Sequence, residues 1–214
     1  MKRLFMCLCI VALSFSCSES DNSENLNNQS DSNFYALTVG NSWVYKNYRY
    51  NPSTQIYDDT GVIDSISIVD VQDILGQSYY KFRTLTTGNE EEITFCNPNG
   101  EHFEFLREVQ GNLINEQGDI KFTNNNFEER LLNEYDWGTI YEILTEDHTI
   151  LNVEAGEFHC INSERYAITS NGEQSPGLDR FYYASGIGLI YDTSSFASNP
   201  TPTIIRRLDS YLVQ

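Results

Sequence analysis

Five cysteines and three histidines are the residues whose types could carry nucleophilic, redox or metal chemistry. Cys96 and Cys160 lie well inside the chain, and in an oxidising compartment an even pair is more often a disulfide than two thiols. Such a bridge would close a loop of about 65 residues and stabilise the fold by roughly 4 kcal/mol. Two buried thiols or a metal site are the alternatives. The histidines His102, His148 and His159 have no paired ligand spacing, so we expect no metal and no cofactor.

The other three cysteines, Cys7, Cys9 and Cys17, fall in the first seventeen residues. Lys2 and Arg3 give this stretch a positive start, and the residues from 4 to 15 are almost all apolar. A run of about 12 apolar residues matches the core of a secretory signal peptide and is too short to span a bilayer. Residues 1–16 are therefore predicted to be a signal peptide and are left out of the fold.

Leu13-Ser14-Phe15-Ser16-Cys17 resembles a bacterial lipobox, in which the peptidase cuts before a cysteine that carries a diacylglyceryl thioether. Only Cys17 has a small residue before it, since Cys7 follows Met6 and Cys9 follows Leu8. The usual lipobox leucine is one place further back here, with Ser14 in its position. The resemblance implies lipid attachment, including palmitate, at Cys17. The alternative is a soluble secreted protein that is cut elsewhere.

Residues 17–33 are predicted to form the lipidated cysteine and a disordered acidic tether. Residues 18–33 contain one aliphatic residue, no aromatic residue, four acidic residues and no basic residue. Such a segment cannot bury enough apolar area to offset the entropy lost on ordering. The early acidic residues Glu19 and Asp21 resemble surface-export signals of Bacteroidota lipoproteins. We therefore expect a lipid-anchored protein of the outer membrane, with the cell surface slightly favoured over the periplasmic face.

The charge balance limits the possible partners. Removal of Lys2 and Arg3 from 13 basic residues leaves 11 against 31 acidic ones, a net charge of about −20. A surface this acidic repels nucleic acid and anionic headgroups, so nucleic-acid binding is excluded as a function class. The expected partners are the membrane, through Cys17, and a lipid, glycan or protein that the sequence does not specify.

Residues 34–214 are expected to form a single β-rich domain. Five segments are rich in aromatic and β-branched residues with alternating polarity, which is typical of strands: 42–50, 76–87, 91–95, 101–109 and 156–169. Turn signals separate them, including Asp59-Thr60-Gly61, Leu75-Gly76 and Asn99-Gly100, the last a candidate hairpin turn. The pattern predicts an all-β fold: one curved antiparallel sheet, half-barrel or barrel-like, with at most one or two short helices.

Three segments of this domain carry more specific expectations. The spacing of apolar residues in 127–135 suits a short helix. Residues 203–213 have apolar residues every four positions, which suits either a helix face or one side of a strand, and they are predicted to be a closing strand. Phe103 and Phe105 share one face of their strand, opposite His102 and Glu104. We expect the phenylalanine face to be the inner one, either as packed core or as an apolar groove.

Three stretches resemble motifs of small Bacteroidota-type envelope lipoproteins. Residues 34–45 are similar to F-x-P-L-x-x-G-x-x-W-x-Y, with Ala36 in place of the proline. Residues 153–161 are similar to V-P-A-G-x-F-x-C-I, with Glu154 in place of the proline, and residues 183–190 to Y-A-x-G-V-G-L-V. The resemblance implies a curved antiparallel sheet. More distantly, it extends to half-barrel lipoprotein carriers and lipid-binding lipoproteins.

No catalytic string such as G-x-S-x-G or H-E-x-x-H is present in the sequence. We therefore expect a protein that is not an enzyme: a non-catalytic binding or structural module of the cell envelope. The alternative is a carrier or sensor of acyl chains that uses the concave face of a half-barrel. That alternative requires an open apolar groove, and an apolar face has the same sequence pattern whether it is open or filled.

Overall fold

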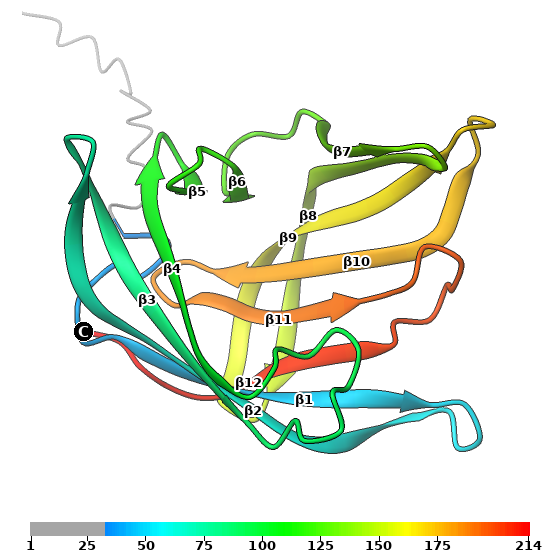
Figure 1. Ribbon diagram of the computed structural model, residues 1–214, viewed down its shortest axis with the longest axis horizontal. Helices are drawn as coiled ribbons and strands as arrows, with labels where there is room; N and C mark the ends of the chain where they lie inside the picture. The colour runs from blue at the N-terminus through cyan, green and yellow to red at the C-terminus, as the bar shows by residue number, and fades with distance from the viewer. Residues whose placement is uncertain (1–32) are drawn as a thin grey trace, which may run out of the picture.

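The computed structural model describes residues 33–214, which form a single twelve-stranded sheet (Figure 1). The strands are β1 (Ser42–Asn51), β2 (Ile56–Ile74), β3 (Gln77–Thr87), β4 (Gly100–Val109), β5 (Asn112–Asn115), β6 (Ile120–Thr123), β7 (Arg130–Tyr135), β8 (Gly138–Val153), β9 (Gly156–Thr169), β10 (Gln174–Ala184), β11 (Gly188–Ser194) and β12 (Ile204–Leu212). Residues 33–214 include no helix, and so none that could span a membrane. The expected all-β fold with a curved antiparallel sheet is confirmed.

The strand order across the sheet is β6-β5-β4-β3-β2-β1-β12-β11-β10-β9-β8-β7. Every strand pairs antiparallel with its sequence neighbours except that β6 does not pair with β7, and β1 also pairs with β12. This is the order of an up-and-down barrel from which one pairing, between β6 and β7, is missing. The sheet therefore curls strongly without closing, and its two edges are in the middle of the sequence rather than at its ends (Figure 1).

Alternation along the strands determines which side chains face the concave side. In β1 the side chains of Trp43, Tyr45 and Asn47 are buried, and the residues between them are half-buried. Paired residues on neighbouring strands lie on the same face. Tyr45 is paired with Asp64 in β2, and Asp64 is paired with Thr86 in β3, so all three face the concave side. The concave face therefore combines large aromatic side chains with buried polar ones.

The segment before β1 closes one end of the curled sheet. Phe34, Tyr35, Ala36 and Leu37 are all buried, and the Phe34 ring stacks at 6.5 Å on Phe122 of β6. Phe122 in turn stacks at 4.0 Å on Tyr183 of β10. Rings from both halves of the sheet therefore meet on this segment, which compensates in part for the missing β6–β7 pairing.

The first and third motifs of the sequence meet in this region. The Trp43 indole nitrogen donates to the Ile187 carbonyl at 2.8 Å, and the Tyr45 hydroxyl donates to the Leu189 carbonyl at 2.8 Å. The Gly186 backbone N–H donates to the Phe34 carbonyl at 2.9 Å. These bonds join residues about 150 apart in sequence, as a motif that specifies the fold would require.

The structure corrects three expectations for local structure. Residues 127–135 are not a helix, since β7 begins at Arg130 and pairs with β8. Residues 91–95 lie in the loop between β3 and β4, so Asn99-Gly100 ends a long loop and is not a two-residue hairpin turn. Asp59-Thr60-Gly61 lies inside β2, where the pairing with β1 shifts register, so it marks a bulge rather than a turn. The closing strand predicted within residues 203–213 is confirmed as β12.

Candidate functional site

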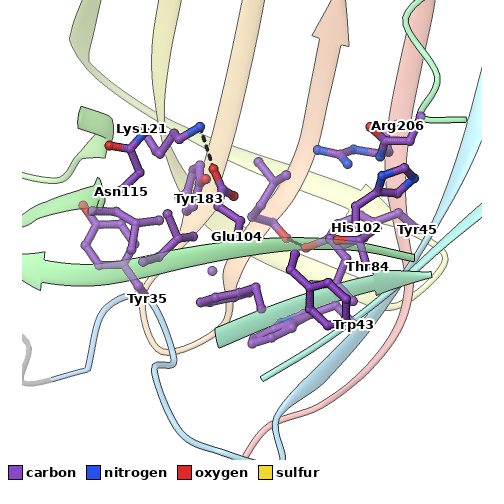
Figure 2. Close-up of a pocket in the computed structure, with 18 of the residues that line it drawn as sticks. Tyr35, Trp43, Tyr45, Thr84, His102, Glu104, Asn115, Lys121, Tyr183 and Arg206 are labelled. Atoms are coloured by element: carbon purple, nitrogen blue, oxygen red, sulfur yellow. Dashed lines mark hydrogen bonds and ion pairs between the residues drawn. The ribbon is translucent and has the colours of Figure 1, made fainter. Parts of the chain in front are cut away.

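A cavity of about 560 Å³ opens on the concave side of the sheet (Figure 2). Strands β1 to β6 supply most of its wall, and β10, β11 and β12 supply the rest. It is lined by Tyr35, Trp43, Tyr45, Ile66, Phe82, Thr84, Asn97, His102, Phe103, Glu104, Leu106, Leu113, Asn115, Glu116, Gln117, Lys121, Tyr183, Gly188, Leu189 and Arg206. Its volume falls in the range of about 300–1,000 Å³ that is usual for small-molecule sites.

Aromatic rings form one wall of the cavity. The Trp43 and Phe82 rings stack at 6.2 Å, and the polar atoms of Trp43 and Tyr45 are bonded to backbone carbonyls. The Tyr35 hydroxyl donates to the Gly111 carbonyl at 2.6 Å. Because these polar atoms are occupied, the three side chains offer rings rather than hydrogen bonds to the cavity, and they are held rigidly.

Polar side chains lie next to these rings, since Glu104 is paired with Phe82 across β3 and β4. Lys121 and Glu104 make an ion pair at 2.6 Å across β6 and β4, and both side chains are a little over two-fifths exposed. His102 Nε2 lies 2.8 Å from the Pro98 carbonyl oxygen. Tyr183 lines the cavity from β10, and burial raises the pKa of its phenol, so the hydroxyl stays protonated. A protonated hydroxyl can donate a hydrogen bond as well as accept one.

Arg206 lies at one end of the cavity, at the right of Figure 2, and its guanidinium is next to two carboxylates. Its guanidinium binds Asp192 through Nε at 3.0 Å and Nη2 at 2.7 Å, and Nη1 is 3.7 Å from Asp64. Burial lowers the pKa of Arg206, but the Asp192 and Asp64 carboxylates outweigh it and the net direction is upward. The guanidinium also lies over the Tyr45 ring, 5.1 Å from its centroid.

The same residues continue into a smaller cavity of about 180 Å³. There Asp64 accepts hydrogen bonds from Thr86 at 2.5 Å, and from Asn97 and Asn47 at 3.2 Å each. The carboxylate is therefore satisfied by the protein itself, as a buried charge must be. Arg206, Asp64 and Asp192 form a structural ion-pair network that borders the larger cavity.

The prediction that the Phe103 and Phe105 face of β4 is the inner one is wrong. His102, Glu104 and Leu106 point to the concave side, where they line the cavity. Phe103 is 49% exposed at the rim, under the Lys81 ammonium at 4.5 Å, and Phe105 is half-buried. The alternation was read correctly, but an inner face that lines an open cavity can be polar, so hydrophobicity alone selects the wrong side.

Cys96 and Cys160 are free thiols in this structure, so the predicted disulfide is absent, and of the two only Cys160 is fully buried. Cys96 lies half-buried in the loop between β3 and β4, whereas Cys160 is buried in β9 among the core residues. Burial raises the pKa of each thiol to about 11, which leaves both protonated and unreactive at neutral pH. Within residues 33–214 no group of three metal-ligating side chains is present. Cys17, the predicted lipid attachment site, lies outside the described residues.

The sequence did not single out Lys121, Glu104, Tyr183 or Arg206 as site residues. Tyr183 begins the third motif, which is the one signal that could have pointed to it. The others come from strands far apart in sequence, and only the curl of the sheet brings them together.

Comparison with known proteins supports the fold. No protein-family model and no curated protein matches the chain. A crystal structure from Bacteroides fragilis, described as an exported protein with a YmcC-like fold, matches with a TM-score of 0.53 and 10% identity over 84% of this chain and 98% of the other. A second, described as a lipoprotein from Parabacteroides distasonis, has a TM-score of 0.44 and 14% identity over the same shares of the two chains. At these identities the likeness concerns the fold alone.

Proposed function

We propose that the protein is a non-catalytic lipoprotein of the outer membrane, anchored through Cys17, whose β-domain binds a small ligand in the concave cavity. The observation that carries this proposal is the cavity itself: about 560 Å³, lined by rigid aromatic rings with polar side chains beside them. Concave sites with an apolar wall and a few placed polar groups are typical of small-molecule binding. The lipobox-like sequence and the exported neighbour from Bacteroides fragilis support the envelope location.

The lining favours a ligand with one apolar face and a polar edge over an acyl chain. Nine of the twenty lining residues carry an amide, a hydroxyl outside an aromatic ring, an imidazole or a charge. An acyl chain would desolvate the Lys121–Glu104 ion pair without offering it any new polar contact, which costs free energy. The carrier alternative is therefore the less favoured of the two functions.

The composition of the cavity also supports a non-catalytic role. Among its lining residues, all within 33–214, there is no Ser or Cys that could act as a nucleophile. Glu104 is held by Lys121, and His102 Nε2 lies next to a backbone carbonyl rather than next to a hydroxyl. Nucleophilic catalysis needs a nucleophile within hydrogen-bond reach of a base, and these side chains do not form such a pair.

The test is to fill the cavity and follow the small molecules that purify with the protein. Thr84 lines the cavity from β3, so Thr84→Trp should occupy much of its volume. Thr87→Trp is the matched control, because Thr87 is exposed on the other face of the same strand. Native mass spectrometry of the mature protein should detect a bound small molecule in the wild type and in Thr87→Trp, and should find it lost in Thr84→Trp.

The identity of the bound mass separates the two functions. A polar or mixed molecule at near-equal molar ratio supports the proposal, whereas a stoichiometric phospholipid or fatty acid would replace it with the acyl-carrier function. A wild-type protein without bound mass, or a mass retained in Thr84→Trp, would contradict binding in this cavity.

A further inference from the structure

Strand β7 is an edge strand whose second side has no partner within residues 33–214. It pairs with β8 from Arg130 to Tyr135, and it ends the strand order of the sheet. Figure 1 shows it along the upper border of the molecule. The opposite edge differs: Phe122 and Thr123 of β6 are buried, whereas four of the six β7 residues are exposed. Exposed edges present unpaired N–H and C=O groups that can accept another strand.

Four large apolar side chains are exposed on or beside this strand. Phe127, Leu131, Tyr135 and Trp137 are 49%, 53%, 51% and 46% exposed. The Tyr135 and Trp137 rings stack on each other at 5.6 Å and 10°. We call residues 127–137 the β7 edge surface. Its apolar groups are not needed for the core, and contiguous exposed apolar groups often mark an interaction site.

The β7 edge surface is also acidic. Glu128, Glu129, Glu134 and Asp136 are all exposed. Its single cation, Arg130, is only 13% exposed, binds Glu142 at 2.5 Å and donates to the Ile120 carbonyl at 3.3 Å. Arg130 is therefore committed to the protein's own structure, and the surface offers negative charge alone to a partner.

We propose that β7 docks an extended, basic segment of another protein, which adds a strand to the sheet edge. Backbone hydrogen bonds would supply affinity, as in other strand-addition complexes. Basic side chains would pair with Glu128, Glu129, Glu134 and Asp136, and apolar ones would contact Leu131, Tyr135 and Trp137. This inference is independent of the ligand proposed for the concave cavity.

Charge argues against two other occupants. Pairing of β7 with β7 of a second copy would bring the two acidic surfaces together, and like charges across an interface are unfavourable. Anionic membrane headgroups would be repelled for the same reason. Acidic residues also protect edge strands from aggregation. That role explains Glu134 and Asp136, but it does not explain why Leu131, Tyr135 and Trp137 are left exposed beside them.

The test measures binding of two peptides to the mature lipoprotein in detergent micelles: an eight-residue Lys-Val repeat and its Glu-Val counterpart. The chain has two tryptophans, and Trp43 is 4% exposed whereas Trp137 is 46% exposed, so a fluorescence change on binding would come from Trp137. The Lys-Val peptide should bind and change this fluorescence. The double variant Glu134→Lys/Asp136→Lys should bind it at least tenfold more weakly, and should gain affinity for the Glu-Val peptide.

The matched control is Asp70→Lys/Glu157→Lys, which changes the net charge equally at exposed positions on β2 and β9. It should leave the affinity for the Lys-Val peptide within about twofold. Equal weakening in both double variants would show attraction to the overall charge and would overturn the proposal. Self-association of the wild type that Glu134→Lys/Asp136→Lys abolishes would assign β7 to a second copy instead. If the wild type binds neither peptide, the proposal that β7 docks a basic segment is also overturned.

Discussion

Ala36 lies at a backbone conformation that few side chains adopt. Its φ is +52°, its side chain is fully buried, and its N–H donates to the Asn33 carbonyl at 3.0 Å. Its own carbonyl accepts from the Asn41 amide at 2.8 Å. The sequence resemblance leads one to expect proline here, but proline fixes φ near −65° and has no N–H. The segment that closes the end of the sheet therefore follows a local path that a proline could not follow.

Replacing Ala36 by proline should destabilise the protein strongly. The substitution removes the hydrogen bond to Asn33 and forces φ away from +52°, and together these should cost about 2–4 kcal/mol of unfolding free energy. Urea unfolding followed by far-ultraviolet circular dichroism measures the change. The control is Ala36→Gly, in which relief of strain and greater freedom of the unfolded chain oppose each other, so that stability should change by less than about 1 kcal/mol. A stable Ala36→Pro variant would mean that this segment can take another path.

At the scale of elements, the tight turn at Leu75-Gly76 was predicted correctly from the sequence, unlike the turns expected at Asp59-Thr60-Gly61 and Asn99-Gly100. Leu75-Gly76 connects β2 to β3, and both residues have positive φ, +53° and +78°. Two positive values in a two-residue loop define the turn whose twist matches that of the flanking strands, and asparagine followed by glycine is its preferred sequence. Leu75 is therefore unfavourable in this turn, and it is also 98% exposed.

We expect Leu75→Asn to stabilise the protein. Asparagine tolerates a left-handed backbone better than leucine, and Leu75 loses no packing because it is almost fully exposed, so the gain should be about 0.5–1 kcal/mol. The urea midpoint should rise accordingly. Val71→Asn is the matched control: Val71 is also exposed on β2, but it lies in strand conformation, where asparagine is disfavoured, so its midpoint should fall. A midpoint that falls for Leu75→Asn would refute this account of the turn.

Other elements could not be predicted from local patterns. Phe127, Leu131 and Tyr135 have helical spacing, but pairing with β8 determines the conformation, and a single sequence carries no record of that pairing. The apolar or β-branched residues at 93–95 suggested a strand. Instead, Asn89 holds this loop by accepting from the Ile93 N–H at 2.8 Å and donating to the Asn97 carbonyl at 2.7 Å. Which face of β4 lines the cavity is determined by the curl of the whole sheet, because the curl brings distant strands together, and a local pattern does not contain this information.

At the scale of the whole molecule, the order of strands places both ends of the domain at the centre of the sheet. β1 follows the first described residues and β12 ends the chain, and the two strands pair with each other. The edges β6 and β7 are thus far along the sequence from the predicted anchor. A lipid at Cys17 would attach through residues 17–32 to the segment that closes one end of the sheet, and it would leave the cavity and the β7 edge surface free to bind.

The anchor prediction can be tested on the whole protein. Because only Cys17 follows a small residue, Cys17→Ala should abolish incorporation of an alkyne fatty acid and release the protein from membranes or stall its processing. Cys7→Ala and Cys9→Ala are matched controls, since both residues should be removed with the signal peptide and neither change should affect the mature product. One acyl chain gives only marginal membrane binding, whereas two or three on one residue hold a protein stably, so loss of the whole group should be visible in simple fractionation. Label that persists in Cys17→Ala would place the lipid elsewhere and contradict the predicted boundary at residue 17.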